Sequence, residues 1–289
     1  MELFALLVAL GIYVVRGGGA PVQQDDWFHR LQGLLAARFS GSGLQVGSVL
    51  LPAVVVQCVY LWAGHGLHGL LQFALLVVVL LFSLGRGNLG AAVVEYLERW
   101  SRGDFQAAHE LVQQEAMAAS GRESSVEDPA ALHTLVRGRL YYRSFERLFP
   151  VIFWFILAGP AAALACRLVL LEEQNSRVGT PENDGGRLAL RHWIEWVPAR
   201  LLALSFALVG DFDACLRRWR EALDNTRLEA VDVLEACGSA ALDLQPPVAD
   251  ESLEALIARG VAEVESVAVL HRRALVVWLV IIALLAMIV

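Results

Sequence analysis

The chain has 289 residues, of which 57% are apolar (Ala, Val, Ile, Leu, Met, Phe, Trp, Tyr or Cys) and 18% are charged, and its mean hydropathy is +0.54. This composition is too apolar for an ordinary water-soluble domain and indicates a protein that buries apolar stretches in a lipid bilayer. The net charge of -7 argues against a nucleic-acid-binding protein, because neutralising phosphate groups requires a basic surface.

All 23 basic residues are arginines, so the chain contains no lysine. A phosphate-binding loop with its usual lysine and a Schiff-base lysine are therefore both excluded. The cysteines never approach CxxC spacing, which indicates reduced structural thiols and neither a zinc site nor a disulfide framework. They are Cys58, Cys166, Cys215 and Cys237. We predict no metal site and no cofactor.

Six apolar stretches are candidates for membrane spans: residues 3–15, 46–63, 67–84, 149–171, 197–209 and 274–289. The second, third and fourth have close to the roughly 20 residues that cross a bilayer. The first and last are shorter, but tilt and local thinning can compensate at the ends of a chain. The stretch 197–209 contains Arg200 and fits a span, a buried half-span or an interfacial helix.

The arginines indicate the orientation, because short cytoplasmic loops collect basic residues. Glu2 replaces the basic region of a cleavable signal, so we expect a retained N-terminal anchor. With six spans and an external N-terminus, the cytoplasmic segments 16–45, 85–148 and 210–273 hold 18 arginines, against 3 in the external segments. If residues 197–209 do not cross, the counts become 11 and 11, and we therefore favour six spans.

The fold class that we predict is all-α: a polytopic helical membrane protein with about six membrane spans and two cytoplasmic helical segments. The segments are residues 1–84 (N-terminal membrane region with three spans), 85–148 (cytoplasmic), 149–209 (central membrane region with two spans), 210–273 (cytoplasmic) and 274–289 (last span).

The two cytoplasmic segments share the phrase Gly-Asp-Phe-x-Ala, which begins at Gly103 and again at Gly210. The glycine allows a left-handed residue after one helix, and Asp104 or Asp211 caps the next helix. We expect a helix from residue 130 to continue into the span 149–171, bent at its prolines. In the second segment we expect one helix over residues 211–242.

Arg139, Arg143 and Arg147 repeat at i, i+4 and i+8, which places three guanidinium groups on one face of the predicted helix. This face either anchors the helix to anionic lipid headgroups or binds a phosphorylated or carboxylated ligand. Arg200 stands at the start of an apolar stretch, where an arginine either finds a structural partner or lines a functional pocket.

Several phrases in this chain resemble the AmpE family of inner-membrane proteins. They are residues 145–154 with Gly159 and Pro160 after them, residues 196–201, and residues 210–212. The resemblance implies a multi-pass protein of the bacterial inner (cytoplasmic) membrane that acts in control of β-lactamase induction and peptidoglycan recycling.

AmpE proteins are distant relatives of the CobD/CbiB membrane enzymes, which form an amide bond in cobalamin biosynthesis. The GRDT-like phrase of those enzymes reads Gly121-Arg122-Glu123-Ser124 here, but the acid and amide of their ENTxDG-like phrase are missing at residues 141–146. Of their NTLDSM phrase, only Glu173 stands near the position of the aspartate. Clustered carboxylates hold Mg²⁺ in phosphate chemistry, so this departure argues against synthase activity.

We therefore hypothesise a membrane regulator or sensor, not an enzyme, that binds a small anionic ligand (a muropeptide or nucleotide) or a cytoplasmic protein partner. The candidate ligand-binding residues are Asp104, Arg122, Glu123, Arg139, Arg143, Arg147 and Arg200, and no catalytic residue is assigned. The alternative is a CobD/CbiB-like enzyme or derived ligase with a pocket at the cytoplasmic face. A transporter ranks third, since few charged residues lie near apolar spans.

Overall fold

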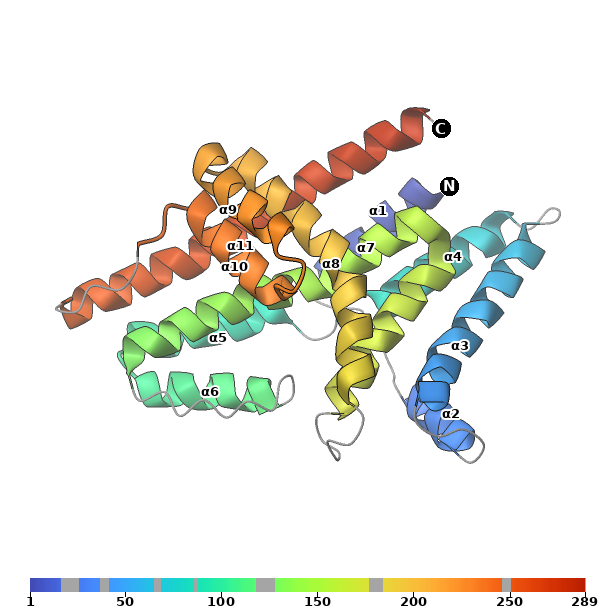
Figure 1. Cartoon of the computed structure of the whole chain (residues 1–289), viewed down its shortest axis with the longest axis horizontal. Coiled ribbons are helices and arrows are strands. Elements are labelled where there is room, and N and C mark those ends of the chain that lie inside the picture. The colour runs from blue at the N-terminus through green and yellow to red at the C-terminus, as the bar shows by residue number, and fades with distance from the viewer. Residues whose placement is uncertain are drawn as a thin grey trace. The chain divides into compact units, whose positions relative to one another are not determined.

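The computed structural model describes residues 1–16, 26–36, 42–64, 69–85, 88–117, 128–176, 184–245 and 251–288. These residues form eleven helices and no strand, so the all-helical prediction is confirmed (Figure 1). The helices fall into two compact units. Unit 1 comprises Met1–Asn88, Arg147–Ile194 and Ala286–Val289, and unit 2 comprises Leu89–Glu146 and Glu195–Leu285.

Unit 1 consists of the following helices and parts of helices. They are α1 (Glu2–Arg16), α2 (Asp26–Ala36), α3 (Ser42–Ala63), α4 (Gly69–Ser83), the part of α7 (Pro129–Ser176) from Arg147 onward and the beginning of α8 (Asp184–Val209). Its hydrophobic core joins four of these helices through Phe28, Val49, Phe82 and Leu168. Burying large apolar side chains is the main stabilising contribution to such a core.

Three helices in the described residues are long and apolar enough to cross a membrane: Val46–Ala63, Pro129–Glu172 and Leu253–Ile288. The helix Gly69–Ser83 is apolar but shorter. Along α3, Val54 is 57% and Trp62 66% exposed, as expected where lipid covers the surface. These features support a membrane protein, whereas the predicted count of six spans is not confirmed.

Helix α7 contains the only sharp break within a described helix. Gly159 has φ 80° and ψ -167°, a conformation open essentially to glycine alone, and Pro160 follows it. Proline lacks an amide hydrogen and crowds the preceding turn, so the pair ends one arm of the helix and starts another. Pro150 leaves the helix continuous, although a bend was expected at both prolines.

Unit 2 consists of the remaining helices. They are α5 (Leu89–Ser101), α6 (Phe105–Met117), the first part of α7, the second part of α8, α9 (Phe212–Asp224), α10 (Ala230–Ala241) and α11 (Leu253–Ile288). Trp100 of α5 is fully buried, and its indole nitrogen donates to the carbonyl of Ile257 in α11 at 3.3 Å. Tyr141 of α7 is also fully buried and lies against the ring of Phe206 in α8.

The single helix expected over residues 211–242 is wrong, because this region forms the two helices α9 and α10. Asn225 ends α9 in an extended conformation with φ -107° and ψ 91°. Neither glycine nor proline marks this turn in the sequence, and its local signal is the short polar run Asp224-Asn225-Thr226. The predicted cap at Asp211 is confirmed, since its carboxylate accepts from the amide of Ala214 at 2.9 Å.

Gly238 allows α10 to approach α7, and replacing it tests this packing. A Cβ at Gly238 would lie 2.2 Å from Cε1 of Tyr141, whose buried ring cannot move aside freely. We expect Gly238→Ala to lower the free energy of unfolding by about 1–3 kcal/mol, measured by thermal unfolding in detergent. The control Gly33→Ala, in α2, meets nothing within 4 Å and should not destabilise. Equal melting temperatures would contradict the prediction.

Candidate functional site

The predicted site residue Asp104 has a structural role in the described chain. Its carboxylate accepts from the backbone amide of Ala107 at 3.0 Å and caps the N-terminus of α6. Gly103, with φ 73°, makes the left-handed turn before it. This arrangement is the one that the repeated Gly-Asp-Phe phrase predicts.

The three arginines of the predicted anion-binding face divide between the two units. Arg139 and Arg143 belong to unit 2, and Arg147 belongs to unit 1. The guanidinium group of Arg147 donates to the Tyr13 hydroxyl from Nε at 3.0 Å and from Nη2 at 2.7 Å. Nη1 of Arg143 lies 3.4 Å from a carboxylate oxygen of Glu146, whose side chain is 8% exposed. Burial and, to a smaller extent, the positive charge of Arg143 lower the pKa of Arg139 below its ordinary value.

Arg122 and Glu123 lie outside the described residues, so their place relative to these groups stays a prediction.

Arg200 is buried and holds the turn between α9 and α10. Nη2 donates to the carbonyl oxygens of Ala222, Asn225 and Leu228 at 3.2, 3.4 and 3.5 Å, and the guanidinium group lies 4.2 Å from the centre of the Trp196 ring. A cation at the C-terminal end of α9 satisfies carbonyls that have no partner within the helix. These contacts favour the structural alternative for Arg200 over a ligand pocket.

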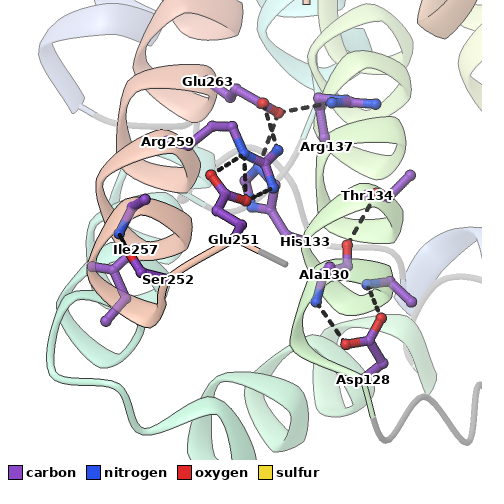
Figure 2. Close-up of polar contacts among 12 residues, drawn as sticks. Asp128, Ala130, His133, Thr134, Arg137, Glu251, Ser252, Ile257, Arg259 and Glu263 are labelled. Atoms are coloured by element: carbon purple, nitrogen blue, oxygen red, sulfur yellow. Dashed lines mark hydrogen bonds and ion pairs between the residues drawn. The ribbon is translucent and has the colours of Figure 1, made fainter. Parts of the chain in front are cut away.

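A buried ionic network lies between α7 and α11 in unit 2, and sequence reasoning missed it (Figure 2). Its centre is the carboxylate of Glu263, which is 5% exposed. Oε2 accepts from Nη1 of Arg137 at 2.7 Å, and Oε1 accepts from Nη1 of Arg259 at 2.9 Å. Glu235 of α10 adds a weaker contact, with Oε1 3.8 Å from Nη2 of Arg137.

His133 is the third partner of Glu263 and is almost completely buried. Its Nε2 lies 3.1 Å from Oε2 of Glu263, and because the ionised carboxylate has no proton to give, this nitrogen is the donor. Nδ1 faces the hydroxyl of Tyr96 at 3.4 Å. Burial raises the pKa of Tyr96, so its phenol stays protonated and can donate to Nδ1 when that nitrogen carries no proton.

The outer part of the network is a bidentate ion pair between Arg259 and Glu251. Nε and Nη2 of Arg259 donate to the two carboxylate oxygens at 2.8 to 3.1 Å. These hydrogen bonds lower the pKa of Glu251 below its ordinary value of 4.5. Arg259 thus bridges two carboxylates and fixes the start of α11 on the network (Figure 2).

The network is suited to holding helices together. Each charged group faces an opposite charge or a hydrogen-bonding partner, and neither a bound ion nor a ligand is needed to balance the carboxylates. Within the described ranges, no three His, Cys, Asp or Glu side chains are placed to hold a metal ion. One sequence signal could have indicated the network: His133 and Arg137, like Arg259 and Glu263, are spaced at i and i+4 on helices.

Removing the central carboxylate tests how much the network stabilises unit 2. We expect Glu263→Gln to destabilise the protein by about 3–5 kcal/mol, because Arg137 would keep a buried charge without its main partner and Arg259 would lose one of its two carboxylates. The matched control Glu265→Gln lies on the same helix at an exposed position and should have little effect. Thermal unfolding in detergent measures both variants. A Glu263→Gln protein as stable as the control would contradict the prediction.

The ion pair of Glu251 predicts an acid-dependent loss of stability. Because the folded protein holds the pKa of Glu251 below 4.5, the carboxylate stabilises the folded state fully above about pH 4.5. This contribution falls as the pH drops through the lowered pKa. We expect Glu251→Gln to unfold at a lower temperature than the wild type at pH 7 and to differ less from it as the pH falls. A difference independent of pH, or one that Glu254→Gln reproduces, would contradict this.

Comparison with known proteins gives two further findings. A region of 150 residues is 27% identical to the cobalamin biosynthesis protein CobD of Stutzerimonas stutzeri (strain A1501), and it covers 50% of this chain and 47% of that protein. The chain thus matches about half the length of this curated relative. No solved structure shows a significant match.

The family comparison covers almost the whole chain. The family described as "Regulatory signalling modulator protein AmpE" matches residues 1–288. This match includes both units and all the apolar helices. The chain therefore belongs to the AmpE family.

Proposed function

We propose that this protein is a regulator in the bacterial inner membrane that modulates β-lactamase induction and the response to peptidoglycan recycling. In this proposal the apolar helices hold the chain in the bilayer, and the helices of unit 2 recognise a small anionic ligand at the cytoplasmic face. The family membership and the apolar helices support a membrane regulatory protein. The anionic ligand and the link to β-lactamase induction are the parts of the proposal that the experiments below test.

The observation that carries the ligand proposal is the pair formed by Arg139 and Arg143. The two residues lie one turn apart on α7, both are partly exposed, and the charge of Arg143 acts on Arg139. Like charges at i and i+4 destabilise a helix, and an anion that contacts both guanidinium groups would relieve this repulsion. Arg143 also contacts the carboxylate of Glu146 at 3.4 Å, a longer contact than those of Arg137 and Arg259 with Glu263 at 2.7 and 2.9 Å.

The chemistry of the pair limits the ligand class. Guanidinium groups match phosphate and carboxylate oxygens with paired hydrogen bonds, and a chain without lysine relies on them for anion recognition. Nucleotides offer phosphate groups, and muropeptides offer carboxylates. Either ligand is compatible with this pair.

The proposal is tested by binding measurements on the purified, detergent-solubilised protein. Titration calorimetry with a muropeptide and with a nucleotide should show binding of at least one, and Arg139→Ala/Arg143→Ala should weaken it by about tenfold or more. The matched control is Arg102→Ala/Arg227→Ala, which removes the same charge from exposed positions of unit 2. No binding of either ligand, or equal weakening in the control, would contradict ligand recognition by this pair.

The regulatory role has its own readout in cells. The chromosomal Arg139→Ala/Arg143→Ala variant should alter β-lactamase activity after exposure to a β-lactam, while the control double variant should behave as wild type. A normal response in both variants, with equal protein levels, would remove the arginine pair from the proposed role.

The similarity to a CobD protein favours one second candidate, an amide-forming membrane enzyme. Its acidic residue would be Glu123, which lies outside the described residues. The substitution Glu123→Gln separates the candidates. A normal cellular response in this variant alongside a defect in Arg143→Ala favours binding over catalysis, and the reverse pattern favours the enzyme.

A further inference from the structure

The apolar part of α7, residues 147–172, contacts other helices of unit 1 at both of its ends. At its beginning, the carbonyl oxygen of Arg147 accepts from the amide of Gly85, just after α4, at 2.7 Å. The approach is close enough that a Cβ on Gly85 would lie 2.7 Å from Cα of Arg147. The side chain of Arg147 meets Tyr13 near the end of α1. The beginning of this segment therefore lies at the C-terminal ends of α1 and α4.

The other end of the segment is fixed by Glu172. Its carboxylate accepts from Ser48, near the beginning of α3, at 3.1 Å and from Gln32 of α2 at 3.4 Å. Leu168 and Leu171 belong to the same core cluster as Val49 of α3 and Phe82 of α4. This end therefore lies beside the N-terminal end of α3 and the C-terminal end of α4.

The two ends of the segment thus lie at the same end of the bundle. Helices α3 and α4 follow one another along the chain and pack together, so the beginning of α3 and the end of α4 are on one side. The break at Gly159 and Pro160 supplies the reversal between the two ends (Figure 1). Each arm is about 20 Å long at 1.5 Å per residue.

We propose that the apolar part of α7 is a re-entrant hairpin that inserts into the lipid and returns to the side from which it came. Its tip at Gly159 meets the acyl chains inside the bilayer, where Leu157 is 64% exposed on the protein surface. Lipid is the occupant of this surface, because no charged side chain lies in residues 148–166. Helices α1, α3, α4 and α11 then cross, giving four crossings in place of the six that the sequence predicts.

The second part of α8 independently supports this path within unit 2. Trp219 of α9 donates to the carbonyl of Arg200 at 2.8 Å, and Sγ of Cys215 lies 3.4 Å from the carbonyl of Ala203. Helix α9 therefore runs back along the stretch that the six-span prediction places in the bilayer. Arg217 and Arg220 of α9 are exposed, which is incompatible with a surface surrounded by lipid.

The distribution of arginine agrees with four crossings. With this path, residues before α1, between α3 and α4, and after α11 form the outer side, and they contain none of the 23 arginines. All the arginines lie on the inner side, except Arg167, which lies near the inner end of the returning arm. The six-span path instead leaves Arg177, Arg187 and Arg191 outside. The positive-inside rule therefore favours the re-entrant path.

Labelling with a membrane-impermeant maleimide in spheroplasts tests this path on the full-length protein. Replacing the exposed Cys58 with serine gives the background, since the other three cysteines are buried. Single cysteines at the exposed residues Ala189 and Leu190 are compared with Gly64→Cys, between α3 and α4, and Asp213→Cys, on α9. Six spans place Ala189 on the side of Gly64, whereas four crossings place it on the side of Asp213.

We expect Ala189→Cys and Leu190→Cys to be protected in intact spheroplasts like Asp213→Cys and labelled after permeabilisation, while Gly64→Cys is labelled in both. Labelling of either test cysteine in intact spheroplasts at the rate of Gly64→Cys would overturn the hairpin. Because the two test positions are adjacent, a defect in one variant leaves the other as the test. The result does not depend on whether unit 2 binds an anion.

Discussion

Burying the carboxylate of Glu263 is tolerable only because Arg137, Arg259 and His133 all donate to it. Removing such an ion from water costs several kcal/mol, which these contacts must offset, so the network is sensitive to the loss of any partner. Its members come from α7 and α11, which are far apart in the sequence. The two charged segments must therefore share one aqueous side, and this condition restricts every path that the intervening chain can take.

The cost of placing charged side chains in lipid limits the path of the chain further. Arginine, unlike lysine, does not readily lose its proton on burial, so each of the 23 arginines needs a partner or water. Arg147 finds the Tyr13 hydroxyl, and Arg200 finds the backbone carbonyls at the end of α9. The glycine and proline at residues 159 and 160 let an apolar segment enter the bilayer without carrying its charged flanks across.

This division of charge bears on function. The central carboxylate of unit 2 is already neutralised by its own cations, which is what a stable scaffold requires. In the proposed function, an anion bound to Arg139 and Arg143 relieves the repulsion between their like charges. A ligand can regulate a protein only if it binds one conformational state more tightly than another. The similarity to a CobD protein is limited to about half of each chain.

The sequence alone determined the helical class, the apolar character and the caps at Asp104 and Asp211, because these follow from local periodicity and from contacts within four residues. It also indicated the family. Tertiary structure decided the turn at Asn225, the partners of Glu263 and the return of α7. Periodicity shows which face of a helix is apolar or charged, but not which other helix meets that face. An arginine near an apolar stretch therefore looks the same in the sequence whether it binds a ligand, a carboxylate or a helix end.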